Sequence, residues 1–505
     1  MSLAPCLMVQ GTSSGVGKSL LTAALCRLFR RAGHRVAPFK SQNMSLNAAV
    51  TACGGEIGRA QAAQAAAAGI EPTVDMNPIL LKPEADDRSQ VVVRGHATAS
   101  ARWAEYGRMT PALWPLVAES LARLRAAHDV VIIEGAGSPA EINLTWDIAN
   151  MRVAALADAP VLLVGDIDRG GVFAALIGTL ALLAPDDRAR VAGLIVNRVR
   201  GERAVLDPGL ELLTARTGVP VVGVVPHLGH GLVPEEDSLA LDGVRAPDDA
   251  CLDVAVVRLP RIANFDDVEP LAAEPGVAVR FVTRPADIEL ADIVIVPGSK
   301  STIADLAWLH ARGMAAAIVR AAQEGRVVLG LCGGYQILGD RLEDPHGVEG
   351  GGAADGLALL PGATTFAPRK TTVRVRARVT GAGILADAAG ASVWGYEIHA
   401  GVTLAAHGAP ALTIVERGGL PAAASDGAVV GSVVGSYVHG LLTAGPVRRA
   451  LLRAAARRRG VPADARWGEA ATADRYDRLA DFVGAALDLE AIGRLVGRPL
   501  AAVAS

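Results

Sequence analysis

Residues 11–19, GTSSGVGKS, place a lysine and a serine directly after a run of small residues. The apolar run LMVQ precedes this segment and an alanine- and leucine-rich run follows it, which predicts a strand, a loop and a helix. Backbone N–H groups of such a loop bind phosphate oxygens, the lysine reaches the terminal phosphates, and the serine can ligate magnesium. The usual spacing has glycine at position 12, where this chain has threonine. We predict a nucleotide-phosphate site made by Thr12, Gly15, Gly17, Lys18 and Ser19.

Acidic residues at predicted strand ends could hold a metal ion next to this loop. Glu134 ends the apolar run VVIIE, so its carboxylate is expected at the carboxyl edge of a parallel sheet, beside the loop. A magnesium role for Glu134, together with Ser19, follows from that position. Glu56, in GGEIGRAQ, is a looser candidate for the same metal. Asp166 and Asp168 are weaker candidates, because an acidic residue at a strand end can equally cap a helix.

Lysine is rare in this chain, since only five of its 49 basic residues are lysine. A chain that otherwise uses arginine is expected to keep lysine where a compact point charge is needed. Lys40 lies in PFKSQNMSLN and Lys82 in NPILLKPEADDRSQVVV, beside amide and hydroxyl side chains. We predict that Lys40, Asn43 and Lys82 hold an anionic, non-nucleotide substrate group near the phosphates. Lys370, in the charged run PRKTTVRVR, is interpreted as a lysine retained by chance.

Cys332 is the second candidate for chemistry. The apolar run at 327–331 leads into this cysteine, and two glycines follow before a predicted helix, which is the pattern of a nucleophile elbow. A helix N-terminus favours the thiolate. We predict that His439, in VVGSYVHGLL, takes the thiol proton and that the N–H groups of Gly298 and Gly333 form an oxyanion hole. The alternative is a buried structural cysteine, which is the usual role of this residue type.

The length and pattern of the chain predict two α/β domains. Its 505 residues exceed one ordinary core, and 51% of them are hydrophobic. Short β-branched runs alternate with alanine-rich runs, which is typical of parallel sheets covered by helices on both faces. A polar, turn-rich stretch at 234–249 separates two such series. We predict domains at 1–245 and 250–446, followed by a helical extension at 447–505.

Charge and cysteine content indicate a cytoplasmic protein with a small-molecule partner. The net charge is -3 and the isoelectric point about 6.4, which favours binding to neither nucleic acid nor an anionic membrane. The N-terminus lacks the basic segment of a signal peptide, and the longest uncharged apolar run is shorter than a membrane-spanning helix. Five scattered cysteines form no CxxC pair, which argues against a disulfide framework or a structural zinc site.

Several strings resemble known families. GLCGGYQ with a distal histidine is similar to class I glutamine amidotransferases, and GTSSGVGKS with PFKSQNM and EGAGSPAEINL is similar to dethiobiotin synthetase-like ATP-dependent amidoligases. Their order in one chain resembles the cobyric acid synthase family. The resemblance implies a doubly wound parallel-sheet P-loop synthetase domain followed by a class I glutamine amidotransferase-like α/β domain. It also implies that Cys332 is the glutaminase nucleophile, His439 its base, and that Lys18 and Ser19 bind ATP and Mg2+.

The reaction implied by this resemblance is ATP- and glutamine-dependent amidation of a corrinoid. The substrate would be adenosylcobyrinic acid a,c-diamide, amidated at its b, d, e and g carboxylates to give cobyric acid. Two alternatives stay open: cobyrinic acid a,c-diamide synthase, which the string PFKSQNM disfavours, and a ParA-like ATP-dependent regulatory protein, which Cys332 disfavours. A GTPase is disfavoured too, since NRVR at 197–200 lacks the lysine and aspartate of a guanine-reading NKxD motif.

The residues after His439 depart from the wider amidotransferase pattern. Class I glutaminases usually carry a glutamate two residues after this histidine, where this chain has Leu441. The resemblance implies that a Cys-His arrangement without that glutamate is expected in the cobyric acid synthase branch. The sequence leaves open which group orients the imidazole.

Overall fold

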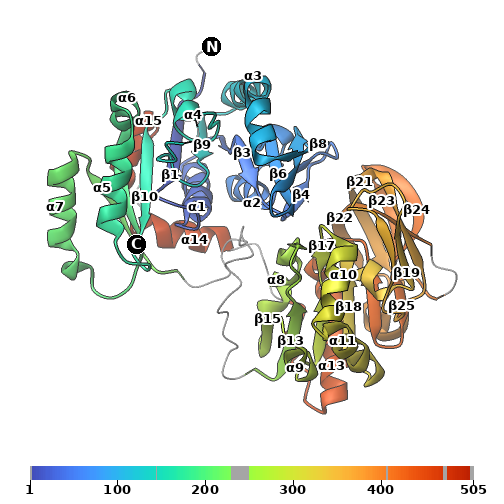
Figure 1. Ribbon diagram of the computed structural model, residues 1–505. Helices are drawn as coiled ribbons and strands as arrows, with labels where there is room; N and C mark the ends of the chain where they lie inside the picture. Colours follow the sequence, from blue (N-terminus) through green and yellow to red (C-terminus); the bar gives the residue numbers. More distant parts are fainter. Residues whose placement is uncertain (1–2, 144, 229–249, 405–407, 470–474, 501–505) are drawn as a thin grey trace.

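The computed structural model describes residues 3–143, 145–228, 250–404, 408–469 and 475–500, which form two α/β domains (Figure 1). The predicted fold class, two successive α/β domains built on parallel sheets, is confirmed. The predicted boundary at residue 245 and the turn-rich stretch before it lie outside the described residues.

The first domain is built on a parallel six-stranded sheet. Its strands run in the order β12, β11, β10, β1, β9, β2, which are Val221–Pro226, Val191–Val199, Val161–Asp166, Cys6–Gly11, Val130–Glu134 and Val36–Phe39. Successive side chains point to opposite faces, so Met8 packs into one core and Val9 into the other. Because β1 and β9 are parallel neighbours, the residues that follow both strands meet at one edge of the sheet.

Helices cover this sheet on both faces, as the alternating pattern predicts. They are α1 (Lys18–Arg31), α2 (Arg59–Ala68), α3 (Trp103–Ala127), α4 (Met151–Ala157), α5 (Val172–Leu182), α6 (Pro185–Ala189) and α7 (Asp207–Thr217). The buried residues of α1 pack with the face that contains Val9, and those of α3 with the face that contains Met8.

Short strands between β2 and α3 extend the first domain, and the sequence pattern did not predict them. One sheet has the order β3, β6, β7, β8, which are Gln42–Met44, Ile79–Ala85, Arg88–Val93 and His96–Arg102. A second pairs β4 (Ala48–Val50) with β5 (Glu56–Gly58). The predicted residues Asn43, Glu56 and Lys82 all lie on these strands, so this insertion decides where they point.

The second domain has its own six-stranded sheet in the order β15, β13, β16, β18, β26, β25. These strands are Val277–Val282, Leu252–Val257, Ile293–Val296, Val327–Leu331, Val433–Ser436 and Ala428–Val430, and all are parallel except β25. Helices around this sheet are α8 (Glu269–Ala272), α9 (Pro285–Glu289), α10 (Thr302–Ala311), α11 (Met314–Gln323), α12 (Gly333–Leu338) and α13 (Gly445–Arg459). Cys332 lies between β18 and α12, at the carboxyl end of a central strand.

A mostly antiparallel sheet flanks the parallel one in the second domain (Figure 1). It contains β19 (Arg341–Asp344), β20 (Gly352–Asp355), β21 (Ala363–Val379), β22 (Ser392–Leu404), β23 (Leu412–Arg417) and β24 (Leu420–Asp426). A separate two-residue pair joins β14 (Ile262–Ala263) to β17 (Gly298–Ser299). Buried residues of β21 and β22 share a core with α13 and the parallel strands.

The C-terminal residues divide between the two domains. Trp467 is fully buried in the core of the second domain, where its indole donates to the Pro275 carbonyl at 2.9 Å. Helix α14 (Arg475–Gly484) instead packs on α1 of the first domain (Figure 1), and α15 (Leu489–Val496) contributes to the same hydrophobic core. The Asp488 N–H also donates to the Val222 carbonyl on the edge strand β12, at 2.8 Å. The chain therefore returns to its first domain after completing the second.

The packing of α14 on α1 generates a stability prediction. Leu479 is fully buried in this contact, so Leu479→Ala should lower the free energy of unfolding of the first domain by about 2–5 kcal/mol. Leu212→Ala, at a position 53% exposed on α7, is the matched control and should change it by less than about 0.5 kcal/mol. Urea unfolding followed by circular dichroism measures both, and equal midpoints for the two variants would contradict the packing role of α14.

Candidate active sites in the two domains

The loop between β1 and α1 has the shape of a phosphate-binding loop. Gly15 and Gly17 have positive φ angles of 73° and 100°, a region that favours glycine. A Cβ atom on Gly17 would lie 2.2 Å from Nδ2 of Asn197, and that amide donates to the Val16 carbonyl at 2.7 Å. The Thr12 N–H still bonds to strand β10, so the loop begins after it. Asn197 therefore supports the loop from β11 and restricts position 17 to glycine.

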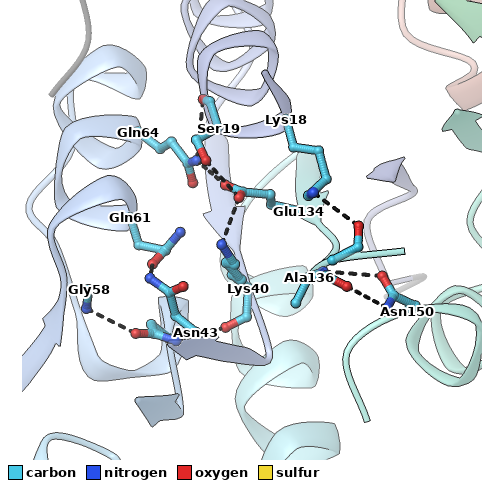
Figure 2. Close-up of polar contacts among 12 residues, drawn as sticks. Lys18, Ser19, Lys40, Asn43, Gly58, Gln61, Gln64, Glu134, Ala136 and Asn150 are labelled. Atoms are coloured by element: carbon cyan, nitrogen blue, oxygen red, sulfur yellow. Dashed lines mark hydrogen bonds and ion pairs between the residues drawn. The ribbon is translucent and has the colours of Figure 1, made fainter. Parts of the chain in front are cut away.

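Lys18 and Ser19 lie at the start of α1 and face the end of β9. Nζ of Lys18 donates to the carbonyl oxygens of Ser13 and Gly137, at 2.9 and 3.1 Å. Oγ of Ser19 donates to Oε1 of Glu134 at 2.8 Å (Figure 2). The structure thus brings the predicted lysine, serine and glutamate together, as the parallel pairing of β1 and β9 requires.

The Glu134 carboxylate is 1% exposed and binds side chains from three segments (Figure 2). Besides Ser19, Nζ of Lys40 lies 2.8 Å from Oε1, and the Gln64 amide on α2 donates to Oε2. Lys40 is itself 4% exposed, so this is a buried ion pair. Removing one partner of such a pair leaves an uncompensated buried charge, so Glu134 and Lys40 hold each other in place.

An amide network fixes the backbone around Lys40. Asn77 donates to the Lys40 carbonyl at 3.1 Å and accepts from the Gly58 N–H at 2.9 Å. Asn43, three residues after Lys40, donates to Oε1 of Gln61 on α2 at 3.0 Å (Figure 2). Of the predicted substrate residues, Asn43 therefore binds Gln61 of α2 directly. Lys40 is connected to the same helix through Glu134, which binds Gln64.

These residues fit a nucleoside triphosphate with Mg2+. The loop N–H groups and Lys18 are suited to phosphate oxygens, and Ser19 and Glu134 present adjacent oxygen atoms to a cation. Mg2+ commonly binds one or two protein oxygens together with phosphates rather than a cage of protein ligands. Within the described ranges, no group of three or more His, Cys, Asp or Glu side chains could hold a metal by itself.

Glu56 has a different environment from the predicted metal shell. Its two oxygens pair with Nζ of Lys82 and with Nζ of Lys370, the latter at 2.7 Å. Burial raises the pKa of Glu56, but the two ammonium groups outweigh it and hold this pKa well below its usual range. The structure therefore gives Glu56 two lysine partners, and its role toward a metal stays a prediction. Burial lowers the pKa of Lys82 to about 8 against the opposing effect of Glu56, and its substrate role stays a prediction.

Lys370, interpreted from the sequence as retained by chance, has a partner in the other domain. It lies on β21 of the second domain, yet its ammonium group pairs with Glu56 on β5 of the first. This contact gives Lys370 a role that its sequence context did not predict, because the lysine joins the two domains through a buried carboxylate.

Cys332 lies in a strained turn, as a nucleophile elbow requires. Its φ is 51° and its ψ -108°, a conformation that is costly for a residue with a Cβ atom. The Cys332 N–H donates to the Ser436 carbonyl at 2.8 Å, and Sγ lies 3.5 Å from the Ile398 carbonyl oxygen. Parallel neighbours on both sides of β18 hold the thiol at the carboxyl edge of the sheet.

The glycines around the elbow allow close backbone contact. A Cβ atom on Gly333 would lie 2.7 Å from the Ser299 nitrogen, and one on Gly334 would lie 1.8 Å from the Val296 carbonyl oxygen. A Cβ atom on Gly298 would lie 3.5 Å from Cε1 of His439. The structure thus gathers Gly298, Gly333 and His439 around Cys332, and the oxyanion role of the two glycines stays a prediction.

His439 is buried and is held by Asp267, a residue that the sequence did not predict. Nδ1 of His439 lies 2.7 Å from Oδ2 of Asp267, whose other oxygen accepts from the Gly440 N–H at 2.9 Å. The imidazole also stacks on Tyr396, with ring centroids 5.2 Å apart. Since Asp267 takes Nδ1, Nε2 is the nitrogen that can serve Cys332. Leu441, at the usual glutamate position, is a buried core residue instead.

The pKa of His439 is raised to about 10. Burial lowers it, but the negative charges of Asp267 and Cys332 outweigh burial. The imidazolium form of His439 is therefore favoured in the neutral range. A thiolate paired with an imidazolium is the activated form of a cysteine nucleophile.

The contributing side chains that escaped prediction include Gln61, Gln64, Asn77, Asn197 and Asp267. The two glutamines are three residues apart in an alanine-rich helix, and that pairing was the available signal. Asp267 lies 172 residues before His439, so no spacing in the sequence connects them.

Comparison with known proteins identifies the class of each domain. Residues 7–229 match the CobQ/CobB/MinD/ParA nucleotide binding domain. Residues 253–447 match the CobB/CobQ-like glutamine amidotransferase domain. The chain is thus a nucleotide-binding domain, here called the ligase domain, joined to a glutaminase domain.

Curated relatives define the family more closely. The cobyric acid synthase of Sorangium cellulosum is 56% identical, covering 97% of this chain and 98% of its own. Those of Dehalococcoides mccartyi (strain CBDB1) and Moorella thermoacetica are 49% and 48% identical, covering 97% and 99% of this chain and 98% and 99% of their own. The chain belongs to the cobyric acid synthase family and is an enzyme, a ligase that contains a glutamine amidotransferase domain. Within the part of the chain described, no helix has the length and apolar character to cross a membrane.

The Asp267 contact predicts the pH dependence of glutamine hydrolysis. Asp267 raises the pKa of His439, so the imidazolium persists at neutral pH and is lost as the pH rises through about 10. Asp267→Asn removes that charge and should shift the alkaline limb of the rate profile to lower pH. It should also lower kcat by roughly 10²- to 10⁴-fold, the range that follows loss of the orienting carboxylate in hydrolytic triads.

Glutamate release measured across pH tests this expectation. Amidation with ammonium in place of glutamine is the control and should persist, because the ligase site is separate. An unchanged pH profile in Asp267→Asn would show that another group orients His439.

Proposed function

We propose that this enzyme uses ATP and glutamine to convert carboxylates of a corrinoid acid into amides, a step of cobalamin biosynthesis in the cytoplasm. One observation carries the proposal: a single chain builds both a Lys18–Ser19–Glu134 site and a Cys332–His439–Asp267 site on contacting domains. A carboxylate resists ammonia until one of its oxygens becomes a leaving group. Amidation therefore needs a phosphorylating site and an ammonia source, and these two sites can supply them.

In the ligase domain, a substrate carboxylate oxygen takes the γ-phosphoryl group of ATP, which gives ADP and an acyl phosphate. Ammonia then adds to the carbonyl carbon, and phosphate leaves to give the amide. Lys18 neutralises charge on the transferring group, while Lys40 and Asn43 hold the substrate carboxylate. Ser19 and Glu134 would hold Mg2+, which supplies further positive charge next to the phosphates.

In the glutaminase domain, His439 takes the proton of Cys332 and the thiolate attacks the glutamine amide carbon. The N–H groups of Gly298 and Gly333 stabilise the oxyanion, and His439 protonates the departing ammonia. Water then hydrolyses the thioester to release glutamate. Asp267 keeps Nε2 of His439 directed at the sulfur throughout.

The name of the relatives supports a particular substrate, adenosylcobyrinic acid a,c-diamide, amidated at b, d, e and g to give cobyric acid. Cobyrinic acid a,c-diamide synthase and a ParA-like regulator gain no such support from them. A ParA-like regulator would also have no use for the strained Cys332 turn.

Separate sites predict separable losses of activity. Cys332→Ala should abolish amidation with glutamine but retain it with ammonium, because the thiolate serves only glutamine hydrolysis. Lys18→Ala should lower amidation by orders of magnitude with either nitrogen source, because it removes charge from the phosphoryl-transfer site. Mass spectrometry of the corrinoid product measures both. A folded Cys332→Ala enzyme that is inactive with ammonium would contradict the proposal of two separate sites.

The buried Lys40–Glu134 pair predicts that arginine cannot replace this lysine. The ammonium group is enclosed together with Gln64 and Ser19, and a planar guanidinium has a different shape and reach. Lys40→Arg should therefore lower ammonium-dependent amidation by roughly 10²-fold or more, the effect of about 1 Å of misplacement. Glutamine hydrolysis by the same variant is the internal control and should remain. Unchanged amidation kinetics in Lys40→Arg would contradict this prediction and show that only the positive charge at position 40 is needed.

A further inference from the structure

The segment 264–269 of the glutaminase domain carries the carboxylate that orients the catalytic histidine. It begins with Asn264, which has a left-handed backbone at φ 53°, and continues through the 3-10 helix η4 (Phe265–Val268) into α8. Asp267, inside η4, contacts His439 within the same domain. The other polar side chains of the segment contact different partners.

Those partners come mainly from the ligase domain and from the helix that packs on it. Asn264 donates to the Ala48 carbonyl on β4 at 2.9 Å. Asp266 lies 2.6 Å from Nε of Arg59, the first residue of α2. Glu269 lies 3.4 Å from Nη1 of Arg475, on α14. The element that positions His439 is therefore held in place from outside its own domain.

The Arg59–Asp266 pair is the most buried of these charged contacts. The Asp266 side chain is 2% exposed, and its neighbour Asp267 is a second buried carboxylate. Burial raises the pKa of Asp266, Arg59 opposes this, and the charge of Asp267 adds to it. Without Arg59, the two adjacent buried carboxylates of Asp266 and Asp267 would have only the His439 imidazolium to balance them. The uncompensated buried charge would destabilise the present conformation of the segment.

Helix α2 also reaches the ligase site. Arg59 is two residues before Gln61, which binds Asn43, and five before Gln64, which binds Glu134 (Figure 2). Helix α2 thus contacts the phosphoryl-transfer site through Gln61 and Gln64. It contacts the segment 264–269 of the glutaminase domain through Arg59.

We infer that Arg59 of the ligase domain is a positioning residue for the glutaminase reaction, acting through Asp266 to hold Asp267 and so to aim His439 at Cys332. The inference rests on the glutaminase proposed above. It means that the glutaminase site is complete only when the ligase domain is docked on it.

Variants of the full-length enzyme test this inference through the rate of glutamate release. Arg59→Met, Asp266→Asn and the double variant should each lower kcat for glutamine hydrolysis by roughly 10- to 100-fold. KM for glutamine should stay within about twofold, because no group of the pair is placed against the substrate. The double variant should be no slower than the slower single variant, since the two residues act as one unit. Arg59→Lys should recover part of the rate.

Arg374→Met is the matched control. Arg374 also crosses the interface, donating to the Val50 carbonyl at 2.8 Å and pairing with Glu71 at 2.7 Å. Among the residues that the structure describes, no hydrogen bond or ion pair joins it to residues 264–269. This variant should keep the glutaminase kcat, which separates positioning from general domain packing.

The outcomes separate the two ideas. A wild-type enzyme that releases no glutamate refutes the proposed glutaminase itself. A wild-type enzyme that does release it, with unchanged kcat in Arg59→Met or in the isosteric Asp266→Asn, refutes the positioning role. Losses that multiply in the double variant, or an equal loss in Arg374→Met, refute it as well.

Discussion

A buried carboxylate must be paired, and Glu134 shows how much of the ligase site follows from that requirement. Glu134 is the last residue of the central strand β9, so it lies at the carboxyl ends of the parallel strands, beside the phosphate loop that follows β1. Its oxygens bind Ser19 of α1, Lys40 beyond β2, and Gln64 of α2. Three segments that are distant in sequence are thereby fixed around one point, and the phosphate loop acquires a neighbouring cation and a neighbouring acid.

The same requirement joins the two domains. Glu56 balances Lys82 from its own domain and Lys370 from the other, and Asp266 is balanced by Arg59 across the interface. Each domain therefore contains one buried carboxylate, Glu56 in the first and Asp266 in the second, that pairs with a basic side chain of the other domain. Charged contacts of this kind specify one docking arrangement, because a shifted interface would strand a buried charge. The return of α14 and α15 to the ligase domain adds apolar contact to that specificity.

The glutaminase site shows a second constraint, the crowding of backbone around Cys332. The thiol occupies a strained turn that brings Gly333 and Gly334 against the loop after β16. Glycine is required there because any Cβ atom would overlap a backbone atom. The role of the Gly298 and Gly333 N–H groups as an oxyanion hole beside this crowded backbone stays a proposal. The buried pair of His439 and Asp267 completes the site with an imidazole ring that is held in one orientation.

Local sequence patterns determined the parallel strands, the phosphate loop and the elbow, because each of these is specified by neighbouring residues. The runs CLMVQG and VVIIE carry alternating side chains into two cores, and Lys18, Ser19 and Cys332 follow strands whose direction fixes where they point. Tertiary structure alone decided the partners of the buried charges. Asp267 reaches His439 through the fold of the second domain, whereas Lys370 reaches Glu56 and Arg59 reaches Asp266 across the interface between the domains. No spacing along the chain specifies any of these pairings. Burial makes a partner obligatory, but only the folded chain determines which residue supplies it.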